Sequence, residues 1–198
     1  MDEIIDVNEN KIKVAGIYNE SDANGPGIRY VVFTQGCPHH CPGCHNPETH
    51  DFNAGGYYKD IDEIVKEVTT NPLITGVTFS GGDPFMQAQK MGRLAEKLRA
   101  HGYDIMTYTG YTYEQLLALE NDTNHFMDLL SKTDILVDGR FVEELKDERL
   151  LFVGSKNQRI IDVKVSLLAG MVKLKDIHAE ENEITEIFAN KYVTNFAS

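Results

Sequence analysis

All three cysteines of this 198-residue chain lie in one short loop. Cys37, Cys41 and Cys44 are separated by three and then two residues, and the sequence has no fourth cysteine. A cubane iron–sulfur cluster usually takes four thiolates, so three would leave one iron open to a cofactor or substrate. A disulfide framework fits poorly, because the rings would be tiny and one thiol would remain. The spacing therefore predicts metal or thiol chemistry.

Taken alone, the cysteine loop also fits a structural zinc site. Zn²⁺ is commonly held by four Cys or His ligands at short spacing. Four histidines lie in or near the loop and offer a fourth ligand, namely His39, His40, His45 and His50. A structural zinc site does not require glycine-rich loops elsewhere in the chain. Such loops occur after the later predicted strands described below, and they make a structural zinc site the less favoured interpretation.

Short apolar runs alternate with segments of helical periodicity over residues 30–137. Strands are predicted at Tyr30–Phe33, Gly76–Phe79, Asp104–Tyr108 and Ile135–Val137. Helices are predicted between them, over Ile61–Val68, Met91–Leu98, Tyr113–Leu119 and Phe126–Leu130. This alternation is the signature of an α/β fold with parallel strands and crossover helices.

Polar or glycine-rich loops follow all four predicted strands. They are Cys37–Cys44, Ser80–Pro84, Thr109–Gly110 and Asp138–Arg140. Parallel α/β sheets and barrels carry their reactive groups in the loops at the carboxyl ends of the strands. We therefore expect the four loops to form one site.

The two flanks are less regular. The alternating residues Lys11–Val14 predict an edge strand, and Arg159–Val163 predicts another strand. Apolar residues recur at helical spacing over Glu180–Val193, which predicts an amphipathic helix packed on the domain or on a partner.

Composition narrows the class of protein. The chain is 41% hydrophobic and 25% charged, values that are typical of globular domains. Its net charge of -12 disfavours a nucleic-acid partner, because the long-range interaction with phosphates is repulsive. The sequence shows neither a signal-peptide pattern nor an apolar run of about 18 residues. We expect a cytoplasmic protein without a membrane partner.

The three cysteines and the glycine-rich segment after the next predicted strand resemble the radical S-adenosylmethionine superfamily. The resemblance implies a partial, laterally open (β/α) barrel in which Cys37, Cys41 and Cys44 hold a [4Fe–4S] cluster. S-adenosylmethionine would chelate the fourth iron through its amino and carboxylate groups. Electron transfer would then cleave the cofactor to a 5′-deoxyadenosyl radical that abstracts a hydrogen atom. The cofactor carries that chemistry, and the protein positions it.

Further motifs resemble the glycyl-radical-enzyme activases of this superfamily, and among them the proteins that serve an anaerobic ribonucleoside-triphosphate reductase. These motifs are Gly25–Arg29, Gln35–Pro47, Tyr108–Thr112, Asp138–Phe141 and Gly154–Arg159, within a resemblance that spans Lys11–Leu168. Its extent implies an activase domain over residues 1–168 and a C-terminal extension over residues 169–198. The resemblance implies an oxidoreductase that removes a hydrogen atom from a glycine Cα of the reductase large subunit. It also implies a low-potential electron donor such as flavodoxin.

The resemblance also implies roles for individual residues. Cofactor-binding positions are Ser80, Gly81, Gly82, Asp83, Thr109, Gly110, Asp138 and Arg140. No catalytic side chain is implied beyond the cluster and the cofactor. Asp138 is equally compatible with a turn before Gly139. Arg29 fits an anchor for its loop, a partner contact or a plain salt bridge. His39, His40 and His45 are expected to be loop residues or to lie just behind the residues that hold the ligands.

Two other functions remain open at this point. A small radical enzyme acting on a free metabolite, such as a carboxy-deazaguanine synthase, predicts a basic, enclosed pocket and no protein partner. A zinc- or iron–sulfur-binding interaction module predicts that changes in Ser80–Asp83 affect stability alone. A closed eight-stranded barrel would count against a site that admits a protein loop.

Overall fold

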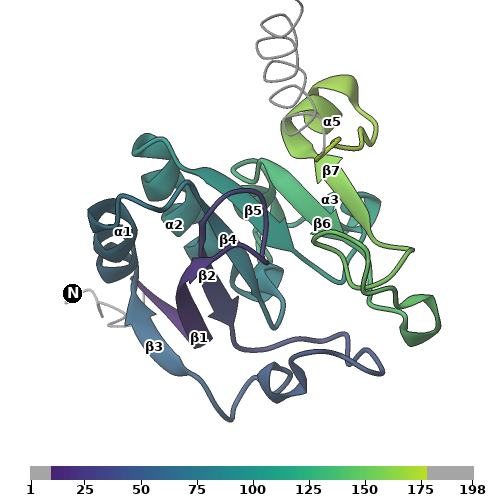
Figure 1. Cartoon of the computed structure of the whole chain (residues 1–198), viewed down its shortest axis with the longest axis horizontal. Coiled ribbons are helices and arrows are strands. Elements are labelled where there is room, and N and C mark those ends of the chain that lie inside the picture. Colours follow the sequence, from purple (N-terminus) through teal and green to yellow (C-terminus); the bar gives the residue numbers. More distant parts are fainter. Residues whose placement is uncertain (1–9, 178–198) are drawn as a thin grey trace, which may run out of the picture.

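Seven strands form one open sheet in the computed structural model, which describes residues 10–177. The strands are β1 (Lys11–Ser21), β2 (Arg29–Thr34), β3 (Tyr57–Asp60), β4 (Gly76–Gly81), β5 (Asp104–Tyr108), β6 (Ile135–Asp138) and β7 (Arg159–Asp162). Their order across the sheet is β3-β1-β2-β4-β5-β6-β7 (Figure 1). Over the described residues, β3 and β7 are the two ends of this order, and the sheet does not close on itself. The helix predicted over Glu180–Val193 lies outside the described residues.

The four predicted central strands are confirmed, and they are parallel. β2 pairs with β4, β4 with β5, and β5 with β6, all in the parallel sense. β1, β3 and β7 are antiparallel additions at the two sides. The fold is therefore α/β with a mixed sheet.

The prediction that Lys11–Val14 forms an edge strand is wrong. These residues open β1, which lies between β2 and β3. The edge position belongs to β3, Tyr57–Asp60, which pairs with the first residues of β1. β3 has only four residues and no alternation of buried and exposed side chains, so periodicity alone does not identify it.

Local sequence signals set the helix boundaries. The helices are α1 (Ile61–Thr70), α2 (Ala88–Ala100), α3 (Tyr113–Leu119), α4 (Phe126–Leu130) and α5 (Val163–Ala169), with 3₁₀ turns η1 (Pro47–Thr49), η2 (Pro84–Gln87) and η3 (Glu143–Leu145). Thr112 and Gln115 form a capping box that begins α3. Asp60 accepts a hydrogen bond from the backbone of Asp62 and caps α1.

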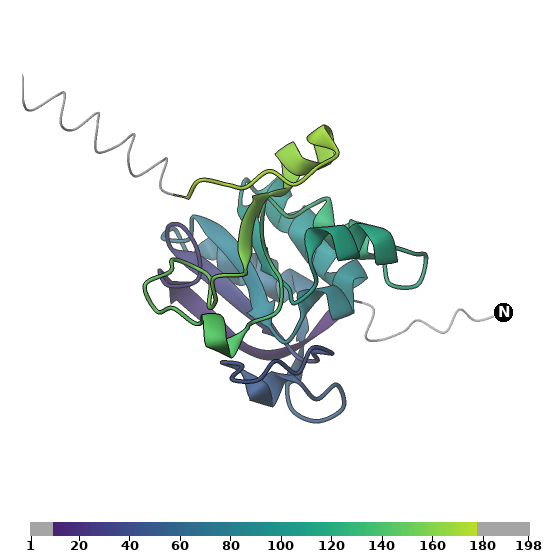
Figure 2. The ribbon, with the colours of Figure 1, turned by 90° about the vertical axis from the view of Figure 1, so that its right-hand side faces the viewer.

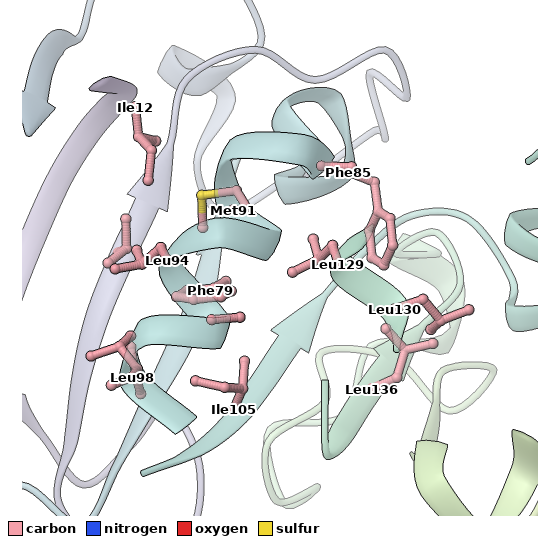
Figure 3. Packing of buried hydrophobic residues seen from close by; sticks show 14 of the residues in the cluster. Ile12, Phe79, Phe85, Met91, Leu94, Leu98, Ile105, Leu129, Leu130 and Leu136 are labelled. Atoms are coloured by element: carbon pink, nitrogen blue, oxygen red, sulfur yellow. The ribbon is translucent and has the colours of Figure 1, made fainter. Parts of the chain in front are cut away.

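The main core lies between the helices and one face of the sheet. Strand residues such as Phe79 and Ile105 pack against Met91, Leu94 and Leu98 of α2, and all five side chains are fully buried (Figure 3). The helices α3 and α4 lie on one side of the sheet, and the loop after β6 lies on the other (Figure 2). The other face carries a smaller apolar cluster built on Met106, Ile135 and Val137.

Arg29 fixes the loop before β2. Its guanidinium donates to Thr78 Oγ1 at 3.1 Å, to the Val77 carbonyl at 2.7 Å and to Asp104 Oδ2 at 2.7 Å. A further contact at 3.4 Å reaches the carbonyl of Pro26 in the loop itself. Arg29 is 1% exposed. It forms a salt bridge with Asp104 and also anchors its own loop, two of the roles that the sequence left open.

Within residues 10–177 no helix has the length and apolar character needed to span a bilayer.

Candidate iron–sulfur and cofactor site

The loops at the carboxyl ends of β2, β4, β5 and β6 line one cavity of about 490 Å³. Eight of the predicted site residues line it, namely Cys37, Cys41, Cys44, Ser80, Gly81, Gly82, Thr109 and Gly110. Gly139, after β6, also lines it. The parallel register of the four strands brings these distant segments to the same edge of the sheet.

Backbone hydrogen bonds hold the cysteine loop. The Cys37 N–H donates to the His50 carbonyl at 3.1 Å, and the Gly36 N–H donates to the Thr49 carbonyl at 2.8 Å. The Cys44 N–H donates to the Cys41 carbonyl at 3.1 Å, which closes a turn between the second and third thiols. All three thiols are free, and Cys37 is the buried one. The segment around η1 therefore fixes the start of the cysteine loop through backbone hydrogen bonds.

Burial makes these thiols poor acids on their own. It raises the pKa of Cys37 to about 11, although the His39 backbone N–H donates to the sulfur and acts in the opposite direction. Burial also raises the pKa of Cys41, against the effects of the Phe141 N–H and the Arg140 charge. Iron binds thiolates, so binding of a cluster here would release protons. The positive charge of the irons would stabilise the thiolates that burial disfavours.

The donor set fits a cubane iron–sulfur cluster with one open iron. Three free thiols from one loop line the cavity, and such a cluster is held by cysteine thiolates. Across residues 10–177, no group of three or more His, Cys, Asp or Glu side chains is arranged to hold a metal ion. The cavity beyond the thiols has the size of a small-molecule site.

Gly81 and Gly82 allow two loops to meet closely. A Cβ on Gly81 would lie 2.5 Å from the Thr34 nitrogen, and one on Gly82 would overlap the Gly36 carbonyl oxygen. The Gly82 N–H donates to the Thr34 carbonyl at 2.7 Å. Gly81 also has φ of +93°, which favours glycine. The glycines thus pack the end of β4 against the cysteine loop, in addition to leaving space for a ligand.

Asp83 does not line the cavity. Its buried carboxylate accepts hydrogen bonds from His39 Nε2 and Thr109 Oγ1, both at 2.8 Å, and from the Gly110 N–H at 3.1 Å. The other oxygen accepts from the Phe85 N–H at 3.0 Å and caps η2. Asp83 therefore joins three of the four loops.

Asp138 and Arg140 are also outside the cavity lining. Asp138 is 1% exposed and accepts from the Tyr113 N–H at 2.7 Å and from Arg159 Nε at 2.9 Å. These bonds join the end of β6 to the start of α3 and to the start of β7, which is a structural role. Arg140 is exposed, and its carbonyl accepts from Asn157 Nδ2 at 2.8 Å. Its charge reaches Cys41.

His39 was expected in the loop or just behind the ligand residues, and its ring contacts Asp83 directly. Sequence reasoning missed other contributors to the site. Tyr18 and Asn24 line the cavity from β1 and the following loop, and Phe152 lines it from the loop after β6. Their apolar and amide side chains carry no chemical signal in the sequence. Only their positions in the fold place them at the site.

A thiol loop and glycine-rich loops at one edge of an α/β sheet define a radical S-adenosylmethionine enzyme with a single [4Fe–4S] cluster, and residues 23–161 match the family described as 4Fe-4S single cluster domain. The chain is 37% identical over 142 residues to the anaerobic ribonucleoside-triphosphate reductase-activating protein of Escherichia coli (strain K12), covering 68% of this chain and 88% of that protein. It is 32% identical over 150 residues to the protein of the same name from Enterobacteria phage T4, covering 73% and 90%. The chain belongs to the family of anaerobic ribonucleoside-triphosphate reductase-activating proteins.

A second kind of activating enzyme is also similar. The pyruvate formate-lyase-activating enzyme of Staphylococcus epidermidis (strain ATCC 12228 / FDA PCI 1200) is 34% identical over 148 residues. The match covers 70% of this chain and 56% of that enzyme. The shared part is thus most of the present chain and little more than half of the longer relative.

Proposed function

We propose that this protein generates a glycyl radical on an anaerobic ribonucleoside-triphosphate reductase. When bound, the cluster supplies the electron that cleaves S-adenosylmethionine, and the cleaved cofactor removes a hydrogen atom from a glycine Cα. The observation that carries the proposal is the meeting of all three thiols with Ser80–Gly82 and Thr109–Gly110 in one cavity. The names of the relatives supply the identity of the reductase.

The residue roles follow from these positions. Cys37, Cys41 and Cys44 would hold three irons of the cluster. Ser80, Gly81, Gly82, Thr109 and Gly110 would contact S-adenosylmethionine, because they line the cavity beside the thiols. Asp83 and Asp138 would not contact the cofactor and would instead hold in place the loops that do. Arg140 would contribute its charge near Cys41.

The cavity suits a protein substrate better than a small anionic metabolite. Its lining, within the described part of the chain, includes no lysine or arginine, whereas a metabolite enzyme of the kind considered above needs a basic pocket. Tyr18 lines the cavity and is 58% exposed, so the cavity reaches the surface beside β1. We propose that the sheet is the laterally open partial barrel of the superfamily, and that the glycine loop enters on this side.

The remaining assignments are proposals of the same kind. A low-potential donor such as flavodoxin would reduce the cluster, and the protein would work in the cytoplasm. Residues 1–168 would form the activase domain, with residues 169–198 as an extension that packs on it or on a partner. Backbone bonds support the first option at the start of the extension, because Lys173 and Lys175 each bond to β7 at 2.9 Å.

Anaerobic reconstitution tests the proposal. The reconstituted protein should contain about four irons and four sulfides, as a cubane cluster requires. After reduction it should convert S-adenosylmethionine to methionine and 5′-deoxyadenosine. Mixed with the reductase, it should produce a glycyl-radical doublet in the EPR spectrum. Bound zinc without cleavage would contradict the proposal, and cleavage without a doublet on the reductase would favour a metabolite enzyme.

A further inference from the structure

His39 lies between the first two cysteines and contacts two parts of the site at once. Its backbone N–H donates to the Cys37 sulfur. Its ring Nε2 lies 2.8 Å from Asp83 Oδ2, a residue of the loop after β4. The His39 side chain is 4% exposed and that of Asp83 is 1% exposed. A buried contact of this kind is screened little by water.

The same carboxylate oxygen reaches the loop after β5. Asp83 Oδ2 also accepts from Thr109 Oγ1 and from the Gly110 N–H. Gly110 leaves room for the imidazole, because a Cβ at this position would overlap the His39 ring. On the other side, the Tyr111 ring packs edge-on against His39 with a centroid distance of 4.5 Å. The ring of His39 is therefore held in one orientation by two loops.

The second ring nitrogen has no partner. His39 Nδ1 is buried and makes no hydrogen bond, although nearly all buried polar atoms in proteins have one. His39 is among the residues that line the cavity with the three thiols. This nitrogen is therefore available to a ligand or a water molecule in the cavity.

We propose that His39 is a positioning residue that couples the cysteine loop to the loops contacting S-adenosylmethionine, through its hydrogen bond to Asp83. This inference rests on the proposed function. The His39–Asp83 pair sets the distance between the thiols and the loops after β4 and β5. Without it, the cluster assembles on the same three thiols, but the cofactor meets the open iron in a poorly fixed orientation.

The test measures cofactor binding and cluster assembly separately. Full-length wild type, His39→Gln and Asp83→Asn are reconstituted anaerobically, and iron and sulfide are counted. The reduced proteins are then titrated with S-adenosylmethionine while the EPR spectrum of the cluster is recorded. His40→Asn is the matched control, since His40 is the exposed neighbour in the same loop and its φ of 47° suits asparagine.

Both test variants should keep the iron content of the wild type. Their half-saturating concentration of S-adenosylmethionine should rise about 10- to 100-fold, the range by which metal affinity or activity falls when a group that orients metal ligands is removed. His40→Asn should stay within about twofold of the wild type. The double variant His39→Gln/Asp83→Asn should bind no more weakly than Asp83→Asn alone, because Asp83→Asn already alters the bond to His39.

Other results would overturn the inference. Wild-type binding in His39→Gln and Asp83→Asn would show that the pair is merely structural, even if both variants melted at lower temperature. Should His39→Gln fail to assemble the cluster, Asp83→Asn decides alone, since it leaves the cysteine loop intact. If S-adenosylmethionine does not change the EPR spectrum of the reduced wild-type cluster, the proposed function itself is refuted, and this inference with it.

Discussion

The helix-covered face of the sheet and the edge formed by its carboxyl ends are built from different interactions. The face is closed by apolar side chains such as Phe79, Leu94 and Leu98, which are fully buried. The edge is held by backbone bonds, by glycines without side chains and by a few buried polar groups such as Asp83. The comparison teaches that stability and chemistry depend largely on separate groups, so most mutations should affect mainly one of the two, and only the contacts between loops should affect both.

Replacing a thiol should have the largest effect, and only at the edge. Cys41→Ser removes one of the three thiolates, so we expect loss of the cluster and of all S-adenosylmethionine cleavage. The cluster-free forms of the variant and the wild type should unfold at the same urea concentration, because Cys41 packs in no core cluster. Iron analysis and urea unfolding measure the two effects. A variant that keeps cleaving the cofactor would contradict the assignment.

Truncating a core side chain should have the opposite pattern. Phe79→Ala leaves a cavity beneath α2, and we expect it to lower the free energy of unfolding by about 3–5 kcal/mol. Leu73→Ala is the control, since Leu73 is 58% exposed and should change stability by less than about 0.5 kcal/mol. Urea unfolding of the cluster-free proteins compares them without the contribution of metal binding. Equal stability of the two variants would remove the distinction between the two regions.

A methyl group at the loop contact should produce a mixed effect. Gly82→Ala forces the end of β4 away from the Gly36 carbonyl, which we expect to cost about 1–3 kcal/mol and to weaken cofactor binding. Gly16→Ala is the matched control, because a Cβ at Gly16 has no heavy atom within 4 Å. Thermal unfolding and the EPR titration measure both quantities. If Gly82→Ala binds the cofactor like Gly16→Ala, the close approach of the two loops is not needed for the site.

The smallest effect is expected where the two regions adjoin. Arg159 bonds to Glu114 of α3 and lowers the pKa of that carboxyl to about 2, from an ordinary value of 4.5. Because the folded pKa is depressed, the pair stabilises the protein above about pH 4.5, and this stabilisation is lost as the pH falls towards 2. Glu114→Gln should cost up to about 1 kcal/mol at pH 7, since the carboxylate is largely exposed.

Urea unfolding at pH 7, 4 and 2.5 checks the pH dependence. The stability difference between the wild type and Glu114→Gln should shrink steadily over this series. A difference that stays constant with pH would show that Arg159 does not depress the pKa of Glu114. The neighbouring bond from Arg159 to Asp138 is present in both proteins and cancels in the comparison.

The sequence predicts the central part of this fold because its signals are local. Strands β2, β4, β5 and β6 carry dense apolar and β-branched residues, and Thr112 and Gln115 mark the start of α3. β3 was not predicted, because its four residues are exposed or only partly buried and adopt the strand conformation by pairing with β1. Tertiary contact decides such segments, and periodicity does not record it.

The site was likewise predictable only where its signals are local in the sequence. The thiol spacing and the positions of Gly81 and Thr109 after strands follow from the chain order, and the structure places these residues in one cavity. The sequence does not show which polar residue faces a ligand and which is satisfied within the protein. Asp138 is bound to Arg159, 21 residues later, and Asp83 to His39, 44 residues earlier. Pairings at such separations are fixed by the fold.

The fate of one hydrogen atom tests the central claim most directly. The reductase is prepared with glycine deuterated at Cα and mixed with the reduced, reconstituted protein and S-adenosylmethionine. If the edge of the sheet performs the proposed chemistry, the 5′-deoxyadenosine formed should carry one deuterium by mass spectrometry, and the reductase should show a glycyl radical. Unlabelled 5′-deoxyadenosine with an unchanged reductase would contradict the account.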